Sequence, residues 1–251
     1  MQKEEFMLQK RLIELSKTAY RRGIVTYSDF LNLNELNILH TTPKNEWDAP
    51  YETFGGYCDS ERQMAAFLPD ALYYAHFYPI QILKIEPLQK KFAESLTHRD
   101  YLGAILNLGI DRSKIGDILV TEDSAHVFVH ESMAELICRD LTRVRHTSVM
   151  VSQEDAQTFS YTPKYEEITG NVASVRLDSI LSIAFGSSRS KLVAWIEGGK
   201  VFANGKLMTT NSYQLKEGDI ISVRGMGRFK YNGIQSQSRK GRYFVSLHKY
   251  I

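Results

Sequence analysis

The sequence predicts an α+β protein made of three small domains. Helical and strand-like segments alternate along all 251 residues, the length allows two or three small cores, and basic residues gather near one end. Hydrophobic residues make up 43% of the chain and charged residues 24%, which is near the globular average and excludes wholesale disorder. The predicted domains cover residues 1–75, 76–165 and 176–251.

The first predicted domain is an α/β domain. Apolar residues recur at helical spacing after Phe6, and two arginines followed by Gly23 are typical of the end of a helix. Ser28 is the expected N-cap of a second helix. The expected elements are helices at 6–22, 28–39 and 60–67 and a strand at 52–57 that enters a Gly-Gly turn.

The second predicted domain has the order β-α-β-β-α-β, the split βαβ arrangement. Thr97 and Asp100 are expected to cap its first helix and Gly109 to end it. The other elements are strands at 80–86, 117–121, 125–130 and 147–151 and a helix at 132–141.

One strand of this domain places an aromatic residue between two histidines. His126, Phe128 and His130 would share one face of the strand, and the valines between them the other. The first face could stack on bases, or the neighbouring domain could cover it. Positive charge in this domain is modest and comes from Arg112, Lys114, Arg139, Arg143 and Arg145.

The third predicted domain follows residues 161–171, which we interpret as a linker. Leu177, Ile180, Leu181 and Ala184 form one helical stripe. Ser188 is expected to cap a second helix, and Asn204-Gly205 predicts a hairpin because both central positions of a type I′ turn need positive φ. The strands are expected at 200–203, 206–208, 220–223 and 243–250.

The net charge is unevenly distributed along the chain. The segment from Arg176 onward holds 13 of the 31 Lys and Arg residues but only four of the 29 Asp and Glu residues, a net charge of +9. The rest of the chain carries −7. A basic domain joined to an acidic body predicts a polyanionic partner for the C-terminal part, and a solvated basic surface is the alternative.

Four segments of the third domain resemble the S4 (αL-type) RNA-binding domain: 176–181, 188–191, 197–206 and 216–223. The resemblance implies binding to structured RNA. The implied RNA contacts are Arg176, Ser188, Arg189, Lys191, Lys200, Asn204 and Lys206. We expect four of them to form a basic ridge: Arg189, Lys191, Lys200 and Lys206. Asp178 and Asn204 also have a purely structural interpretation, in a helix cap and in the hairpin turn.

A basic extension follows the S4-like part. Arg224, Arg228 and Lys230 would enlarge the RNA-binding surface. Phe229 and Tyr231 could stack on bases, or they could pack on the sheet.

Residues 54–69 and 100–118 resemble the bacterial YlmH-type S4 proteins, and this likeness extends over almost the whole chain. It implies an RRM-like middle domain and a cytoplasmic protein that associates with the 50S ribosomal subunit. The implied partners are large-subunit rRNA and tRNA, and the implied role is rescue of stalled 50S–peptidyl-tRNA complexes in ribosome-associated quality control. A link to cell-division proteins is also implied.

We expect no catalytic residue and no metal or other cofactor. Arg176-Leu-Asp178 resembles the start of a pseudouridine synthase motif, but the Thr-x-Gly-Leu part is absent. The histidines and the two cysteines show no metal-binding spacing, no apolar run is long enough to span a membrane, and the first residues do not form a signal peptide. The alternatives are an rRNA-modifying enzyme of the pseudouridine synthase type and a cell-division scaffold.

Overall fold

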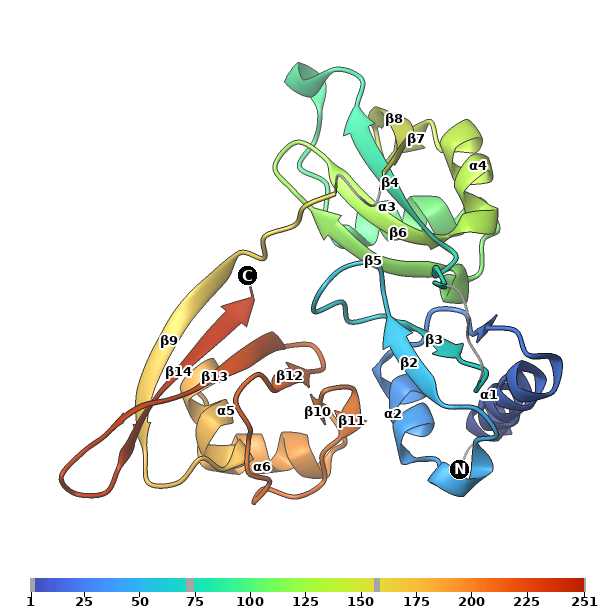
Figure 1. Cartoon of the computed structure of the whole chain (residues 1–251). Helices are drawn as coiled ribbons and strands as arrows, with labels where there is room; N and C mark the ends of the chain where they lie inside the picture. Colours follow the sequence, from blue (N-terminus) through green and yellow to red (C-terminus); the bar gives the residue numbers. More distant parts are fainter. Residues whose placement is uncertain (1–2, 71–74, 156–158, 251) are drawn as a thin grey trace. The chain divides into compact units, whose positions relative to one another are not determined.

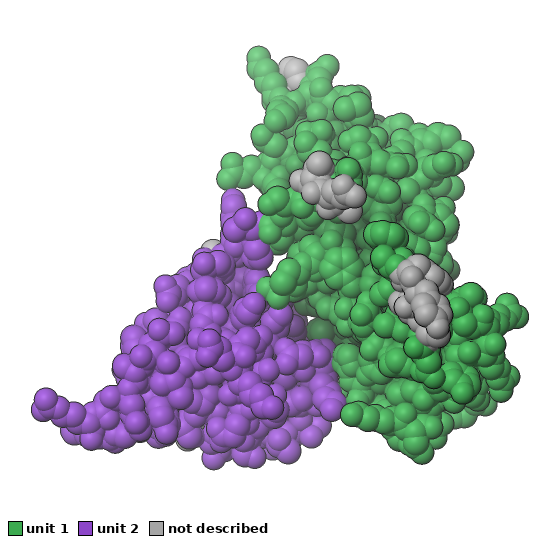
Figure 2. Space-filling model, viewed as in Figure 1, with its two compact units in different colours: residues 1–161 green, residues 162–251 purple. Residues whose placement is uncertain are grey.

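The computed structural model describes residues 3–70, 75–155 and 159–250. The chain divides into two compact units, residues 1–161 and 162–251 (Figures 1 and 2). Both units combine helices with antiparallel sheets, which confirms the predicted α+β class. Among the described residues, no helix combines the length and apolar character that crossing a bilayer requires.

The first part of unit 1 is a three-stranded sheet covered by two helices. The strand order is β1-β3-β2, and the core contains Leu12, Leu36, Leu39 and Phe67. Its elements are α1 (Lys3–Arg22), β1 (Thr26–Tyr27), α2 (Leu33–Thr41), a 3-10 turn (Lys44–Glu46), β2 (Tyr51–Phe54) and β3 (Met64–Phe67). Helix α1 ends at Gly23, whose φ is +63°, as expected.

Helix α2 begins later than the sequence predicts. Asn32, not Ser28, is the N-cap: its Oδ1 accepts the Asn34 N–H at 2.9 Å, and the Asn32 N–H donates to Glu35 Oε2 at 2.7 Å. The Ser28 hydroxyl instead accepts the Ala65 N–H at 2.8 Å. Ser28 therefore forms a hydrogen bond with strand β3 and does not cap α2.

The prediction of a helix at residues 60–67 is wrong. Met64–Phe67 is β3, the central strand of the sheet, and all four residues are buried. Alanine favours helices, but a short apolar run between two strands is also typical of a fully buried strand. The partner strands on both sides decide the outcome.

The second part of unit 1 has the predicted β-α-β-β-α-β order. Its sheet order is β5-β6-β4-β8-β7, and α3 and α4 pack on one face of it. The elements are β4 (Ile80–Pro87), a 3-10 turn (Lys90–Phe92), α3 (His98–Leu106), a 3-10 turn (Arg112–Lys114), β5 (Ile115–Val120), β6 (Ala125–His130), α4 (Glu131–Asp140), β7 (Arg143–Val144) and β8 (Thr147–Glu154). Asp100 accepts both the N–H and the hydroxyl of Thr97, as the predicted cap requires.

The other face of this sheet is covered. Phe128 is fully buried, with ring centroids 5.0 Å from Tyr57 and 5.5 Å from Phe159. Gly56, at φ +101°, lies so close that a Cβ there would be 2.3 Å from the Phe128 ring. Of the two alternatives for this face, cover by the neighbouring domain is confirmed for Phe128, which packs with Phe30, Tyr57 and Met64, so this ring is not available for base stacking.

Arg62 and Asp117 hold the segment that begins at Tyr57 against this face of the sheet. The guanidinium of Arg62, which is 9% exposed, donates to the carbonyls of Ile115, Phe30 and Arg112 at 2.8–3.2 Å. Asp117 accepts from the Tyr57 hydroxyl and from two backbone N–H groups at 2.7–3.1 Å. Burial and then the charge of Arg62 lower the pKa of Arg112 to about 10.

Unit 2 is one six-stranded sheet with both of its helices packed on the same face. The order is β11-β10-β12-β13-β14-β9. The elements are β9 (Tyr165–Val172), α5 (Leu177–Phe185), α6 (Arg189–Glu197), β10 (Val201–Ala203), β11 (Lys206–Leu207), β12 (Ile220–Val223), β13 (Gly227–Gln237) and β14 (Tyr243–Tyr250). Figure 1 shows β13 and β14 as a long hairpin.

The segment interpreted as a linker is largely a strand. Strand β9 pairs with β14 along its whole length, from Tyr165 opposite Tyr250 to Val172 opposite Tyr243. Its acidic residues and Gly170 obscure the alternation that would predict a strand. Gly170 is required here, because a Cβ would lie 2.7 Å from Ile183 of α5.

Replacing Arg62 with Ala should lower the free energy of unfolding by about 2–4 kcal/mol, because three inward-facing carbonyls lose their donor. Urea denaturation measures the change. The matched control is Arg139→Ala, since Arg139 is exposed and its ion pair is with the neighbouring Asp140, and its unfolding midpoint should barely move. Equal midpoints for the two variants would contradict the role given to Arg62.

Candidate nucleic-acid interface

Helix α6 begins without a side-chain cap. Gly186, at φ +58°, ends α5, and Ser188 occupies the N-cap position of α6 as predicted. The Ser188 hydroxyl makes no capping bond and lies 3.3 Å from that of Ser190. The first turn of α6 also contains no acidic residue. Its first N–H groups and the positive end of the helix dipole therefore favour an anion.

Two of the predicted contact residues belong to this first turn. Lys191 is exposed, and its Nζ lies 5.5 Å from the centroid of the Trp195 ring, which holds the ammonium beside the helix. Arg189 is the first residue of α6, and its side chain lies outside what the structure describes. Ser188, Arg189 and Lys191 are thus brought together at one helix end.

Asn204 has a structural task in the hairpin. Its φ is +49° and that of Gly205 is +77°, as the predicted turn requires. The Asn204 amide donates to Asp219 Oδ1 at 2.8 Å and accepts the Ile220 N–H at 2.9 Å. Both ends of the side chain hold the turn, so the structural interpretation of Asn204 fits better than a direct RNA contact.

The two lysines flanking the hairpin are exposed. Lys200 precedes β10 and Lys206 begins β11, and neither has an ion-pair partner among the described residues. The Ala203–Lys206 pairing places Lys206 on the helix side of the sheet, because Ala203 belongs to the core beneath the helices.

Arg176 is held at the other end of α5. Its guanidinium donates to both carboxylate oxygens of Asp178, at 3.2 and 3.4 Å. Asp178 is only 4% exposed, so the pair neutralises part of the charge of Arg176. At a rise of about 1.5 Å per residue, α5 is roughly 13 Å long, and Arg176 lies at its N-terminal end.

The basic extension lies on the opposite face of the sheet. Phe229 and Tyr231 point into the core beneath the helices, so the alternation of β13 turns Arg228 and Lys230 outward. The guanidinium of Arg224 lies 5.4 Å from the Phe202 ring centroid. The basic extension therefore does not continue the surface that carries Lys206 but lies on the other face of the sheet.

Of the two alternatives for Phe229 and Tyr231, packing on the sheet is confirmed and base stacking is wrong. Phe229 is fully buried and Tyr231 is 2% exposed. The aromatic residues that reach the outer face are different ones, which we did not predict from the sequence. Tyr165 stacks on His248 with ring centroids 3.8 Å apart, and Arg228 lies 4.5 Å from the Tyr250 ring. Recognition of β9 as a strand and the alternation of 243–250 would have predicted this arrangement.

The described residues contain no group of three or more His, Cys, Asp or Glu side chains placed to hold a metal ion.

Replacing Asn204 with Ala should lower the free energy of unfolding by about 1–3 kcal/mol, because Ala loses two hydrogen bonds and resists positive φ. Asn204→Gly keeps the turn geometry and should lose less. RNA affinity, measured by filter binding below the unfolding transition, should stay at the wild-type value in both variants. A loss of affinity in both would restore Asn204 as an RNA contact.

Comparisons with known proteins match both halves of the chain. Residues 75–158 match a family model described as "Putative RNA-binding domain in YlmH", and residues 175–221 match the S4 domain. A relative in Bacillus subtilis (strain 168), "Ribosome-associated protein quality control protein P2", is 26% identical over 252 residues, which covers 98% of this chain and 96% of the relative.

Two further proteins share part of the chain. Small ribosomal subunit protein uS4A of Clostridium novyi (strain NT) is 34% identical over 82 residues, 30% of this chain and 40% of that protein. A solved structure, "Cell division protein ylmH from Streptococcus pneumoniae", has a TM-score of 0.50 and 24% identity, and the match covers 62% of this chain and 94% of that one. This last likeness shows the fold alone. The chain therefore resembles the YlmH-type proteins, with a segment in unit 1 that matches their RNA-binding domain and a segment in unit 2 that matches the S4 domain.

Proposed function

We propose that this protein binds structured RNA through its S4 domain and associates with the ribosome by that contact. The observation that carries the proposal is the uncapped start of α6, with exposed Lys191 beside it. Phosphates bind at such helix ends because unpaired N–H groups and the helix dipole both favour negative charge. Lys206, on the helix side of the sheet, adds a second cation for the same backbone.

The names of the similar proteins support a more specific role on the ribosome. The full-length relative is named for ribosome-associated protein quality control, and the shorter relative is named as a ribosomal protein. We propose that the partners are large-subunit rRNA and tRNA on the 50S subunit, in the cytoplasm. The proposed role of the protein there is the rescue of stalled 50S–peptidyl-tRNA complexes. Phosphate contacts would position the protein, and the shape of the RNA would select the site.

The proposed action is binding rather than catalysis. A pseudouridine synthase needs an accessible catalytic aspartate, whereas Asp178 is 4% exposed and engaged by Arg176. This burial supports a structural task for Asp178. Purified protein incubated with rRNA and tRNA should therefore form no pseudouridine, as measured by mass spectrometry of the digested RNA, and measurable product would favour the enzyme.

The double variant Arg189→Ala, Lys191→Ala should weaken binding to 50S subunits and to tRNA. Without these two cations fewer phosphates are neutralised and fewer counterions are released, so the slope of log affinity against log salt should fall by about 1–2. Filter binding at several salt concentrations measures the slope. The matched control is Lys17→Ala, Lys90→Ala, which removes the same charge from lysines paired with Glu14 and Asp123.

An unchanged salt slope in the Arg189/Lys191 variant, with the control also unchanged, would contradict the proposed site. The scaffold alternative, which the name of the Streptococcus pneumoniae structure raises, predicts a different result. Protein partners would then remain bound in pull-downs after RNase treatment.

A further inference from the structure

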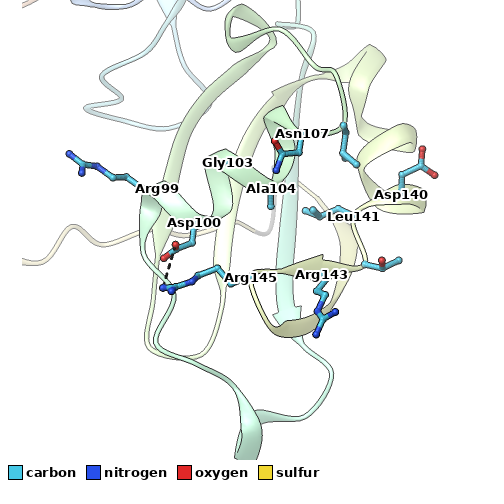
Figure 3. Close-up of a pocket in the computed structure, with 11 residues that line it drawn as sticks. Arg99, Asp100, Gly103, Ala104, Asn107, Asp140, Leu141, Arg143 and Arg145 are labelled. Atoms are coloured by element: carbon cyan, nitrogen blue, oxygen red, sulfur yellow. Dashed lines mark ion pairs between the residues drawn. The ribbon is translucent and has the colours of Figure 1, made fainter.

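The middle domain has a cavity on the side of its helices. It measures about 570 Å³ and lies between α3, the end of α4 and strand β7 (Figure 3). Three arginines and two aspartates contribute to its lining: Arg99, Arg143, Arg145, Asp100 and Asp140. We call it the arginine cavity. It belongs to unit 1 and is distinct from the surfaces of the S4 domain.

Both aspartates of the arginine cavity are already engaged. Asp100 accepts the Thr97 N–H and hydroxyl at 2.8 and 2.7 Å. Asp140 accepts two bonds from the guanidinium of Arg139, outside the cavity, at 2.7 and 2.9 Å. The hydrogen bonds of both carboxylates thus go to residues close by in the sequence, and the contact of Asp100 with a cavity arginine is a long one of 3.7 Å to Arg145.

The arginines retain most of their charge for a partner. Arg99 and Arg143 are exposed, and within the described part of the chain neither has an ion pair. Arg145 makes one long contact with Asp100, at 3.7 Å, and 55% of its side chain is exposed. With Arg139 and the two aspartates included, the cluster has a net charge of +2.

The backbone of Arg145 is a second, independent observation. Its φ is +51°, one of three positive values among the described non-glycine residues. Glycine adopts this conformation freely, whereas a residue with a Cβ is strained there. An arginine at this turn position is unfavourable for folding, which points to a use for its side chain.

We propose that the arginine cavity binds the sugar-phosphate backbone of RNA, as a second contact besides the S4 domain. Guanidinium groups match phosphate with two parallel hydrogen bonds, which lysine cannot make. The inference rests on the proposed RNA-binding function and adds a separate site to it.

The placement of the arginines selects a polymer rather than a small anion. In Figure 3 the three side chains do not converge on one point: Arg99 extends from α3 away from Arg143 and Arg145, which follow one another on the β7 hairpin. A lone phosphate or a nucleotide would be met by one guanidinium at a time. A nucleic-acid backbone presents a phosphate at each nucleotide and meets all three.

The covered sheet face explains why RNA would use this side. In an RRM, bases stack on aromatic residues of the open sheet. Here that face packs on Tyr57 and Phe159 around buried Phe128. Of the five basic residues noted from the sequence, Arg112 bonds to backbone carbonyls, Lys114 pairs with Asp29 and Arg139 pairs with Asp140. The other two, Arg143 and Arg145, line the cavity together with Arg99.

The test uses the full chain with Arg143→Ala and Arg145→Gly combined. Glycine relieves the strained backbone, so the urea midpoint should be unchanged or higher than that of the wild type. The probes are purified bacterial 50S subunits and unfractionated tRNA, in filter-binding assays. Affinity for at least one should fall about 3- to 10-fold for each arginine removed, with a smaller salt slope.

Gly103 offers a matched pair of controls. It lines the cavity on α3, and a Cβ there would meet nothing within 4 Å. Gly103→Glu places a negative charge in the cavity and should weaken RNA binding, whereas Gly103→Gln has nearly the same shape without the charge and should bind like the wild type.

Three outcomes are decisive. If the wild type binds RNA and the Arg189/Lys191 variant is impaired, but the cavity variants bind normally, the arginine cavity is not an RNA site and the S4 proposal stands. If Gly103→Glu and Gly103→Gln bind equally well, the inference also fails. If the wild type binds neither probe, the proposed function itself fails.

Discussion

The burial of one sheet face decides which surfaces of this protein can meet a partner. The segment from Tyr57 to Met64 lies against the middle sheet, and Arg62 and Asp117 fasten it there through hydrogen bonds to residues some 30 to 60 positions away. A buried guanidinium with three backbone acceptors tolerates little movement, since each carbonyl loses a partner if it shifts. The cover is therefore a fixed part of unit 1.

With that face closed, the accessible positive charge of the molecule lies elsewhere. The S4 domain provides the uncapped start of α6 and the lysines of the hairpin. The outer face of its sheet provides Arg224 and Arg228, each beside an aromatic ring. Lys191, Arg224 and Arg228 share one chemistry, in which an aromatic ring holds a cation at the surface of the domain.

Local signals in the sequence predicted elements well where one residue type is required. Gly23 ends α1, Asn204-Gly205 makes the hairpin, and Thr97 with Asp100 caps α3. They failed where partners far along the chain decide. Met64–Phe67 is a strand because β1 and β2 lie on both sides, and β9 exists because β14 pairs with it.

The candidate site shows the same limit. The sequence predicted which residues carry charge, but not which of them are paired within the protein or on which face of the sheet they lie. Asp178 and Asp219 engage Arg176 and Asn204, respectively, and this could not be read from composition. The outward turn of Arg228 and Lys230 follows from the alternation in β13, once Phe229 and Tyr231 are known to be buried.

The pairing of β9 with β14 has a consequence for biosynthesis. Strand β9, which opens unit 2, pairs among the described residues with β14 alone, which lies 71 to 85 residues later in the chain. During translation the S4 helices leave the exit tunnel well before β14 exists to complete the sheet. Loop closure over such a separation is slow, whereas the hairpin of β10 and β11 forms locally. The sheet of unit 2 is thus completed only after β14 has been synthesised.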